Sequence, residues 1–132
     1  LPVNLEDRAY VRAITNMVAC DIHPLNNLRV LHYIENDLNL EVKQKLEWYR
    51  HWIREGFTAL ENFLLRNKKH GQYCLGDAPS LADACLVPQV YNAYRYQCDM
   101  DDYATIRGIN EHCQALVSFR NAAPEKQQDF VR

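Results

Sequence analysis

The sequence is short of glycine and has no closely spaced cysteines, and each shortage excludes a class of protein. Its four glycines form no phosphate-binding loop of the G-x-x-x-x-G-K type. Its five cysteines are odd in number and include no Cys-x-x-Cys pair, so neither a disulfide framework nor a zinc site is indicated. A His-Glu-x-x-His motif is also missing. We therefore expect no metal, and free thiols in a reducing compartment, the cytoplasm.

An excess of charge of either sign is also missing. Fifteen basic and seventeen acidic residues leave a formal net charge of -2, which provides no basic surface for nucleic acid. Apolar runs long enough to cross a bilayer are absent as well. With 48% hydrophobic residues in 132 positions, the chain has the composition of one globular domain. We expect neither nucleic acid nor a membrane as its partner.

What is present is a helical pattern of apolar residues. They recur at spacings of three and four, and this periodicity predicts helices rather than strands. Pro24 should restart the first helix, and the asparagine-rich segment 36–39 should end the next. A long helix follows antiparallel to it, which gives a hairpin, and turns its apolar stripe inward and its charges outward. No repeat and no convincing strand is found, so an all-α domain is predicted over residues 1–132, with helices over residues 5–20, 25–35, 41–66, 80–95 and 103–116.

Ser80 and Asp83 have the spacing of a helical capping box. The Ser80 hydroxyl can accept a hydrogen bond from the backbone N–H of Asp83, whose carboxylate can reach back to the N–H of Ser80. A helix is therefore predicted to begin at Ser80. Further along this helix Pro88 removes one backbone hydrogen bond, so a bend is expected there. We assign Ser80 and Asp83 a structural role.

Some polar residues do not fit a purely structural pattern. Arg29 lies inside the apolar stretch CDIHPLNNLRVL, residues 20–31, together with His23 and Asn27. Arg95 lies among tyrosines at the far end of the predicted helix that contains Pro88. A guanidinium group among apolar residues indicates an anion-binding site. Its planar group can donate two parallel hydrogen bonds to a carboxylate.

Two stretches together identify a family resemblance. The stretch CDIHPLNNLRVL and the stretch LGDAPSLADACLVPQVYNAYR, residues 75–95, resemble the C-terminal helical domain of zeta-class glutathione transferases, the maleylacetoacetate and maleylpyruvate isomerases. The likeness extends from about residue 7 to residue 119. The segment GD with SLAD is shared by most glutathione transferases, whereas DIHP with NL, and VPQV with NA and Arg95, are specific to the class.

The resemblance implies a glutathione-dependent cis-trans isomerisation of a maleyl diacid to its fumaryl isomer. Glutathione would add its thiolate to the double bond, allow rotation about the resulting single bond, and leave again. Arg29 and Arg95 would hold the substrate carboxylates with help from Asn27, and His23 would contact glutathione. No catalytic residue is expected in this chain, because these enzymes activate the thiol in an N-terminal thioredoxin-like domain.

The same resemblance implies a longer parent protein. The chain starts without an initiator methionine, and no βαβ pattern precedes its first helix, so we expect it to be part of a two-domain enzyme that is inactive without the other domain. The full-length protein would be a homodimer, as its relatives are.

Several residue assignments remain open at this stage. Arg29 could instead form a surface ion pair, and His23 beside a proline could bond only to the backbone. Asn27 could satisfy a carbonyl group left free by Pro24. Arg29 also lies about 200° around an ideal helix from Asn27, so either the helix bends there or the arginine curls back over its stem.

Two other functions also remain open. Glutathione conjugation, dehalogenation or peroxide reduction could occur on the same fold. Alternatively, the domain could be a non-catalytic interaction module, in which case nothing would require the arginines to converge.

Overall fold

The computed structural model describes residues 1–128, and this part of the chain is helical, as the sequence predicts. It contains no strand, and a single isolated bridge pairs His70 with Gly76. The elements are α1 (Leu5–Asn16), η1 (Met17–Ile22), α2 (His23–Asn26), α3 (Leu28–His32), η2 (Tyr33–Asp37), α4 (Val42–Asn67), α5 (Leu81–Arg95), α6 (Ala104–Ala115), α7 (Val117–Asn121) and η3 (Pro124–Lys126).

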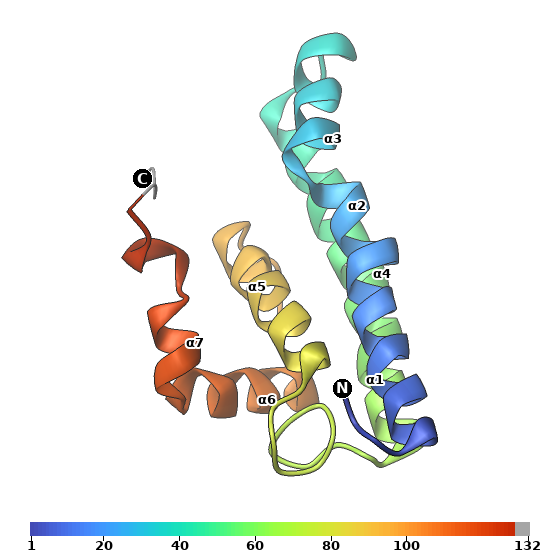
Figure 1. Ribbon diagram of the computed structural model, residues 1–132. Helices are drawn as coiled ribbons and strands as arrows, with labels where there is room; N and C mark the ends of the chain where they lie inside the picture. Colours follow the sequence, from blue (N-terminus) through green and yellow to red (C-terminus); the bar gives the residue numbers. More distant parts are fainter. Residues whose placement is uncertain (129–132) are drawn as a thin grey trace.

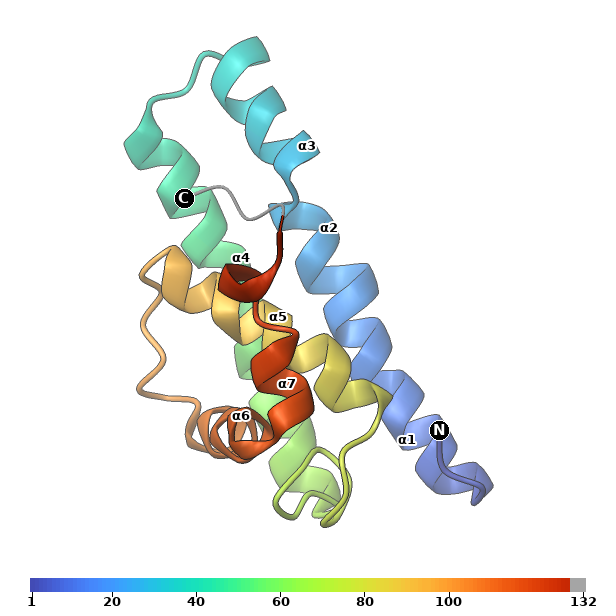
Figure 2. The ribbon, with the colours of Figure 1, turned by 60° about the vertical axis from the view of Figure 1, so that its left-hand side comes forward.

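A long antiparallel hairpin forms one side of the molecule. Its first arm is the succession from α1 to α3, and its second arm is α4 (Figure 1). Helix α5 packs against α1 and η1, while α6 crosses the lower end of the bundle and contacts both α4 and α5. Helix α7 lies on the outer side of α5 (Figure 2). Because α5 has neighbours on both sides, it is the central element of the fold.

The first arm of the hairpin widens before Pro24 and breaks after it. Proline has no N–H group to continue the helical ladder. The preceding turn is a π-helix, in which the N–H of His23 donates to the carbonyl of Val18. Helix α2 then restarts with Pro24 in its first turn, as expected from the sequence. The sharper interruption falls at Asn27, whose ψ of 162° is extended.

This interruption changes which side chains are buried. The apolar stripe that helical spacing predicts over residues 25–34 includes Leu28, but Leu28 is 66% exposed, while Leu31 and Ile34 are buried as expected. The extended backbone at Asn27 turns α3 relative to α2, so a stripe drawn on one continuous helix misplaces the residue next to the break.

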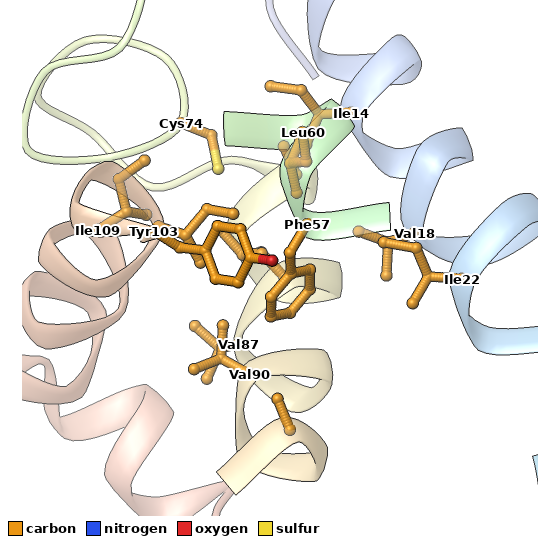
Figure 3. Packing of buried hydrophobic residues seen from close by; sticks show 14 of the residues in the cluster. Ile14, Val18, Ile22, Phe57, Leu60, Cys74, Val87, Val90, Tyr103 and Ile109 are labelled. Atoms are coloured by element: carbon orange, nitrogen blue, oxygen red, sulfur yellow. The ribbon is translucent and has the colours of Figure 1, made fainter. Parts of the chain in front are cut away.

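The two arms of the hairpin approach each other closely at Gly56. A Cβ atom at this position would lie 2.6 Å from Cδ1 of Ile22, which is itself only 1% exposed. Figure 3 shows Ile22 and Val18 directed at Phe57 and its neighbours in the core. The glycine that lowers helix propensity in α4 is therefore what allows η1 to pack against it.

Glu61 departs from the predicted outward orientation of the charges of α4. It is only 7% exposed, and its carboxylate accepts hydrogen bonds from the backbone N–H groups of Thr105, at 2.8 Å, and Ile106, at 3.0 Å. These N–H groups belong to the first turn of α6, where they have no partner within the helix. Glu61 thus caps α6 from a distant part of the sequence.

The close contact at Gly56 gives a stability prediction. The substitution Gly56→Ala should lower the free energy of unfolding by about 1–3 kcal/mol, because overpacking against Ile22 outweighs the gain in helix propensity. The matched control is Gly108→Ala in α6, where no atom lies within 4 Å of the added Cβ. That variant should be stabilised by up to about 1 kcal/mol.

Urea unfolding of the two variants beside the wild type measures both effects. Equal stabilisation by the two alanines would show that the contact with Ile22 does not constrain Gly56.

Candidate functional site: helix α5 and its cavity

Helix α5 begins at a buried carboxylate. Asp83 is fully buried, and its oxygens accept hydrogen bonds from the N–H of Ser80, at 2.7 Å, the hydroxyl of Ser80, at 2.9 Å, and the N–H of Cys74, at 2.8 Å. The Ser80 hydroxyl in turn accepts from the N–H of Ala82. The structure therefore contains the two bonds of a capping box and a third bond that ties the preceding loop to α5.

Two cysteine thiols, of Cys74 and Cys113, lie near this carboxylate. The Sγ atom of Cys113 lies 3.9 Å from Asp83, and burial raises the pKa of Cys113 to about 12, with the negative charge of Asp83 adding to the effect. Burial and the same charge also raise the pKa of Cys74. Both cysteines therefore stay protonated at neutral pH, which excludes them as thiolate nucleophiles.

The other end of α5 closes in a Schellman motif. The N–H of Cys98 donates to the carbonyl of Ala93 and the N–H of Gln97 to that of Tyr94, both at 2.9 Å. Gln97 adopts a left-handed φ of 55°, a conformation usually taken by glycine. Arg95 is the last residue of the helix, so this motif fixes the backbone from which it projects.

Arg95 lines a cavity of about 620 Å³ between α5 and the C-terminal segment. It is the single charged residue among those that line this cavity in the described part of the chain. The lining comes from α5, from the end of α6 and from the segment that starts with α7, and comprises Ala84, Val87, Pro88, Tyr91, Asn92, Arg95, Gln114, Phe119, Ala122, Ala123, Pro124 and Gln127. The cavity is mostly apolar, with one cation and a few amide groups.

Tyr91 joins the C-terminal segment to α5 at the cavity wall. The pKa of its hydroxyl is raised chiefly because it donates a hydrogen bond to Glu125. The pKa of Glu125 is lowered by a hydrogen bond from its own backbone N–H and by the bond from Tyr91. The Tyr91 hydroxyl on α5 and the Glu125 carboxylate on η3 therefore lie close together.

The structure does not bring the other predicted site residues into the lining of this cavity. Arg29 and His23 are exposed, on α3 and α2. Asn27 has both polar groups engaged: its amide donates to the carbonyl of Pro24 at 3.0 Å, and its side-chain oxygen accepts from the N–H of Val30 at 3.2 Å. Asn27 thus caps α3 and satisfies a carbonyl next to the proline. Within residues 1–128 neither Arg29 nor Arg95 forms an ion pair.

The described residues contain neither a metal-binding cluster nor a candidate membrane span. No three His, Cys, Asp or Glu side chains in residues 1–128 are grouped so that they could hold a metal ion. Over the same residues, no helix has both the length and the apolar composition required of a membrane span.

Sequence reasoning missed three contributors to this region. Glu61 and Arg50 act on groups 44 or more positions away, so no local pattern could reveal them. Phe119 lines the cavity from α7, a five-residue helix that was not predicted. The two apolar residues Val117 and Phe119, after Leu116, are the signal in the sequence that could have indicated that helix.

Known proteins resemble this chain along almost its whole length. No family model matches. A probable maleylacetoacetate isomerase of Vibrio cholerae is 46% identical over 129 residues, which cover 98% of this chain and 59% of that protein. The chain therefore spans about three fifths of the length of this curated relative.

Solved structures show the same similarity in three dimensions. A maleylpyruvate isomerase described as a bacterial glutathione S-transferase of the zeta class superposes with a TM-score of 0.95 at 42% identity, over 99% of this chain and 62% of that one. The maleylpyruvate isomerase of Pseudomonas aeruginosa superposes with a TM-score of 0.94 at 39% identity, over 99% and 67% of the two chains.

The fold and the capped central helix define the C-terminal helical domain of a glutathione transferase. Within that class, the identities place the chain in one group. It belongs to the zeta-class family of maleylacetoacetate and maleylpyruvate isomerases.

The buried carboxylate of Asp83 gives a second stability prediction. The substitution Asp83→Ala should lower the free energy of unfolding by about 3 kcal/mol or more, because it leaves buried N–H groups such as that of Cys74 without an acceptor. Ser80→Ala should cost less, about 0.5–2 kcal/mol, since Asp83 keeps its two backbone donors. Chemical unfolding of both variants measures the difference. Equal losses would mean that the bond to Cys74 contributes nothing beyond the capping box.

Proposed function

We propose that this chain is the helical part of a two-domain, glutathione-dependent isomerase that converts maleylacetoacetate or maleylpyruvate to the fumaryl isomer. The observation that carries the proposal concerns Arg95. Its guanidinium is exposed, forms no ion pair within residues 1–128 and lines an apolar cavity. In a family of isomerases that act on maleyl diacids, such a group is suited to one substrate carboxylate.

A dianion needs a second cation, and within residues 1–128 no cation other than Arg95 lines this cavity. We infer that Arg29, exposed on α3 and likewise without an ion pair in the described residues, binds the other carboxylate. Asn27 would assist by fixing the start of α3, since both of its polar groups are used within the chain. Arg29 comes from the first arm of the hairpin and Arg95 from α5, so the substrate would lie between them and the second domain.

Glutathione is the cofactor that this family implies. His23 is suited to contact it, because its imidazole is exposed and forms no hydrogen bond within residues 1–128. When bound, glutathione supplies the thiol that makes rotation about the substrate's double bond possible. The group that activates this thiol would belong to a thioredoxin-like domain outside this chain. We further propose that the full-length protein is a cytoplasmic homodimer.

A second candidate function is glutathione conjugation of an apolar electrophile. The mostly apolar lining of the cavity favours it, because only one of the twelve lining residues is charged. The two candidates differ in their dependence on Arg95, which conjugation of an uncharged electrophile would not need.

The test uses the full-length protein that contains this chain. Glutathione-dependent isomerisation of maleylpyruvate and maleylacetoacetate is followed by absorbance for the wild type and for Arg29→Ala and Arg95→Ala. Each variant should lose about 10-fold to 100-fold in kcat/KM, since a charged hydrogen bond contributes about 1.5–3 kcal/mol. Arg12→Ala, at an exposed position of α1, is the matched control and should keep full activity.

The proposal fails if the wild type isomerises neither diacid. Turnover of an uncharged electrophile that is insensitive to Arg95→Ala would favour conjugation instead.

A further inference from the structure

The last turn of α5 is held against α4 by two consecutive residues of α4. The ring of Tyr49 stacks on the ring of Tyr96, with centroids 3.8 Å apart and planes 13° from parallel. The Nε–H of Arg50 donates a hydrogen bond to the backbone carbonyl of Tyr96 at 3.1 Å. Tyr96 is the C-cap of α5 and directly follows Arg95. A side-chain stack and a hydrogen bond thus fix the residue next to the proposed carboxylate anchor.

This turn needs an external support. Its Schellman motif places Gln97 at a φ of 55°, where a residue with a Cβ atom is strained. The carbonyl of Tyr96 lies beyond the last helical residue, where it has no intrahelical donor. Arg50 supplies that donor from a half-buried position beside Tyr49, which is only 2% exposed.

Arg50 has no other evident partner in the described part of the chain. It forms no ion pair within residues 1–128, and the hydrogen bond of its Nε–H to Tyr96 is the one bond of its side chain there. A surface ion pair therefore does not explain its orientation. Arg54, one helical turn further along α4, is exposed, and the one hydrogen bond of its side chain within residues 1–128 is with His51. Arg50 therefore bonds to the C-cap of α5, whereas the side chain of Arg54 bonds within α4.

We propose that Arg50 is a positioning residue for Arg95: by holding the carbonyl of Tyr96, it fixes the end of α5 and directs the Arg95 guanidinium toward the substrate carboxylate. This inference rests on the proposed function and adds to it a residue of α4. An arginine suits this role because its Nε–H lies in the plane of a rigid guanidinium group. One hydrogen bond therefore orients both the guanidinium of Arg50 and the carbonyl of Tyr96.

The test is a double-mutant cycle in the full-length protein. It compares Arg50→Gln, Arg95→Ala and the double variant, with Arg50→Lys as the conservative replacement and Arg54→Gln as the matched control. The kinetic readouts are the KM for maleylpyruvate, the KM for glutathione and kcat. Amide hydrogen exchange at Gln97 and Cys98 reports on the turn itself, and exchange at Ala84 reports on the opposite end of α5.

The expected result is a rise of about 5-fold to 20-fold in the KM for maleylpyruvate on Arg50→Gln, with the KM for glutathione within twofold of the wild type. In the Arg95→Ala background the same substitution should have no further effect, because Arg50 acts through Arg95. Arg50→Lys should restore part of the loss, and Arg54→Gln should match the wild type. Exchange should accelerate at Gln97 and Cys98 but not at Ala84.

Two results would overturn the inference. One is an unchanged KM for maleylpyruvate on Arg50→Gln, and the other is an equal effect in the wild-type and Arg95→Ala backgrounds, which would indicate a general loss of stability. If the wild type isomerises neither diacid, the proposed function fails separately. Calorimetric titration with malonate then decides about Arg50: weaker binding by Arg50→Gln, lost in the Arg95→Ala background, supports positioning, while equal affinity or no binding by the wild type rejects it.

Discussion

The carboxylate of Asp83 is the group on which the arrangement of the other elements depends. It accepts three hydrogen bonds at a fully buried position, from two residues of different segments. A buried carboxylate is tolerated only when its oxygens have such partners. By satisfying it, the chain fixes at one point the start of α5, the loop that leaves α4 and the side of α6 that carries Cys113. The interactions of Asp83 therefore define where the central helix α5 begins.

Helix α5 is thus fixed at both of its ends, by two different kinds of contact. Asp83 fixes the start through hydrogen bonds that it accepts from the segment before α5, whereas α4 fixes the end through Tyr49 and Arg50. Arg95 lies at the second end, beside an apolar cavity. Rigid support on both sides is what a carboxylate-binding arginine requires, because a flexible guanidinium loses entropy on binding. The stability of the fold and the geometry of the proposed site therefore depend on the same helix.

The sequence predicts what local spacing encodes. The helical class, the hairpin and the capping box of Ser80 follow from apolar periodicity and from residues three apart, and the structure contains all of them. Contacts between distant segments could not be predicted. Glu61 looks like a solvated charge of α4 until α6 is placed against it, and Gly56 looks like a weak point until η1 packs there. Within the site, Arg95 was identified from its aromatic neighbours and from family resemblance, but its dependence on α4 lies outside any local pattern.

A crystal structure of the full-length protein with glutathione and malonate tests the central claim most directly, namely that α5 presents Arg95 to a substrate carboxylate. We predict a malonate carboxylate within hydrogen-bond distance of the Arg95 guanidinium, with the carbonyl of Tyr96 still bonded to Arg50. A malonate bound elsewhere, with Arg95 directed into solvent or paired with an acidic residue of the other domain, would contradict the account.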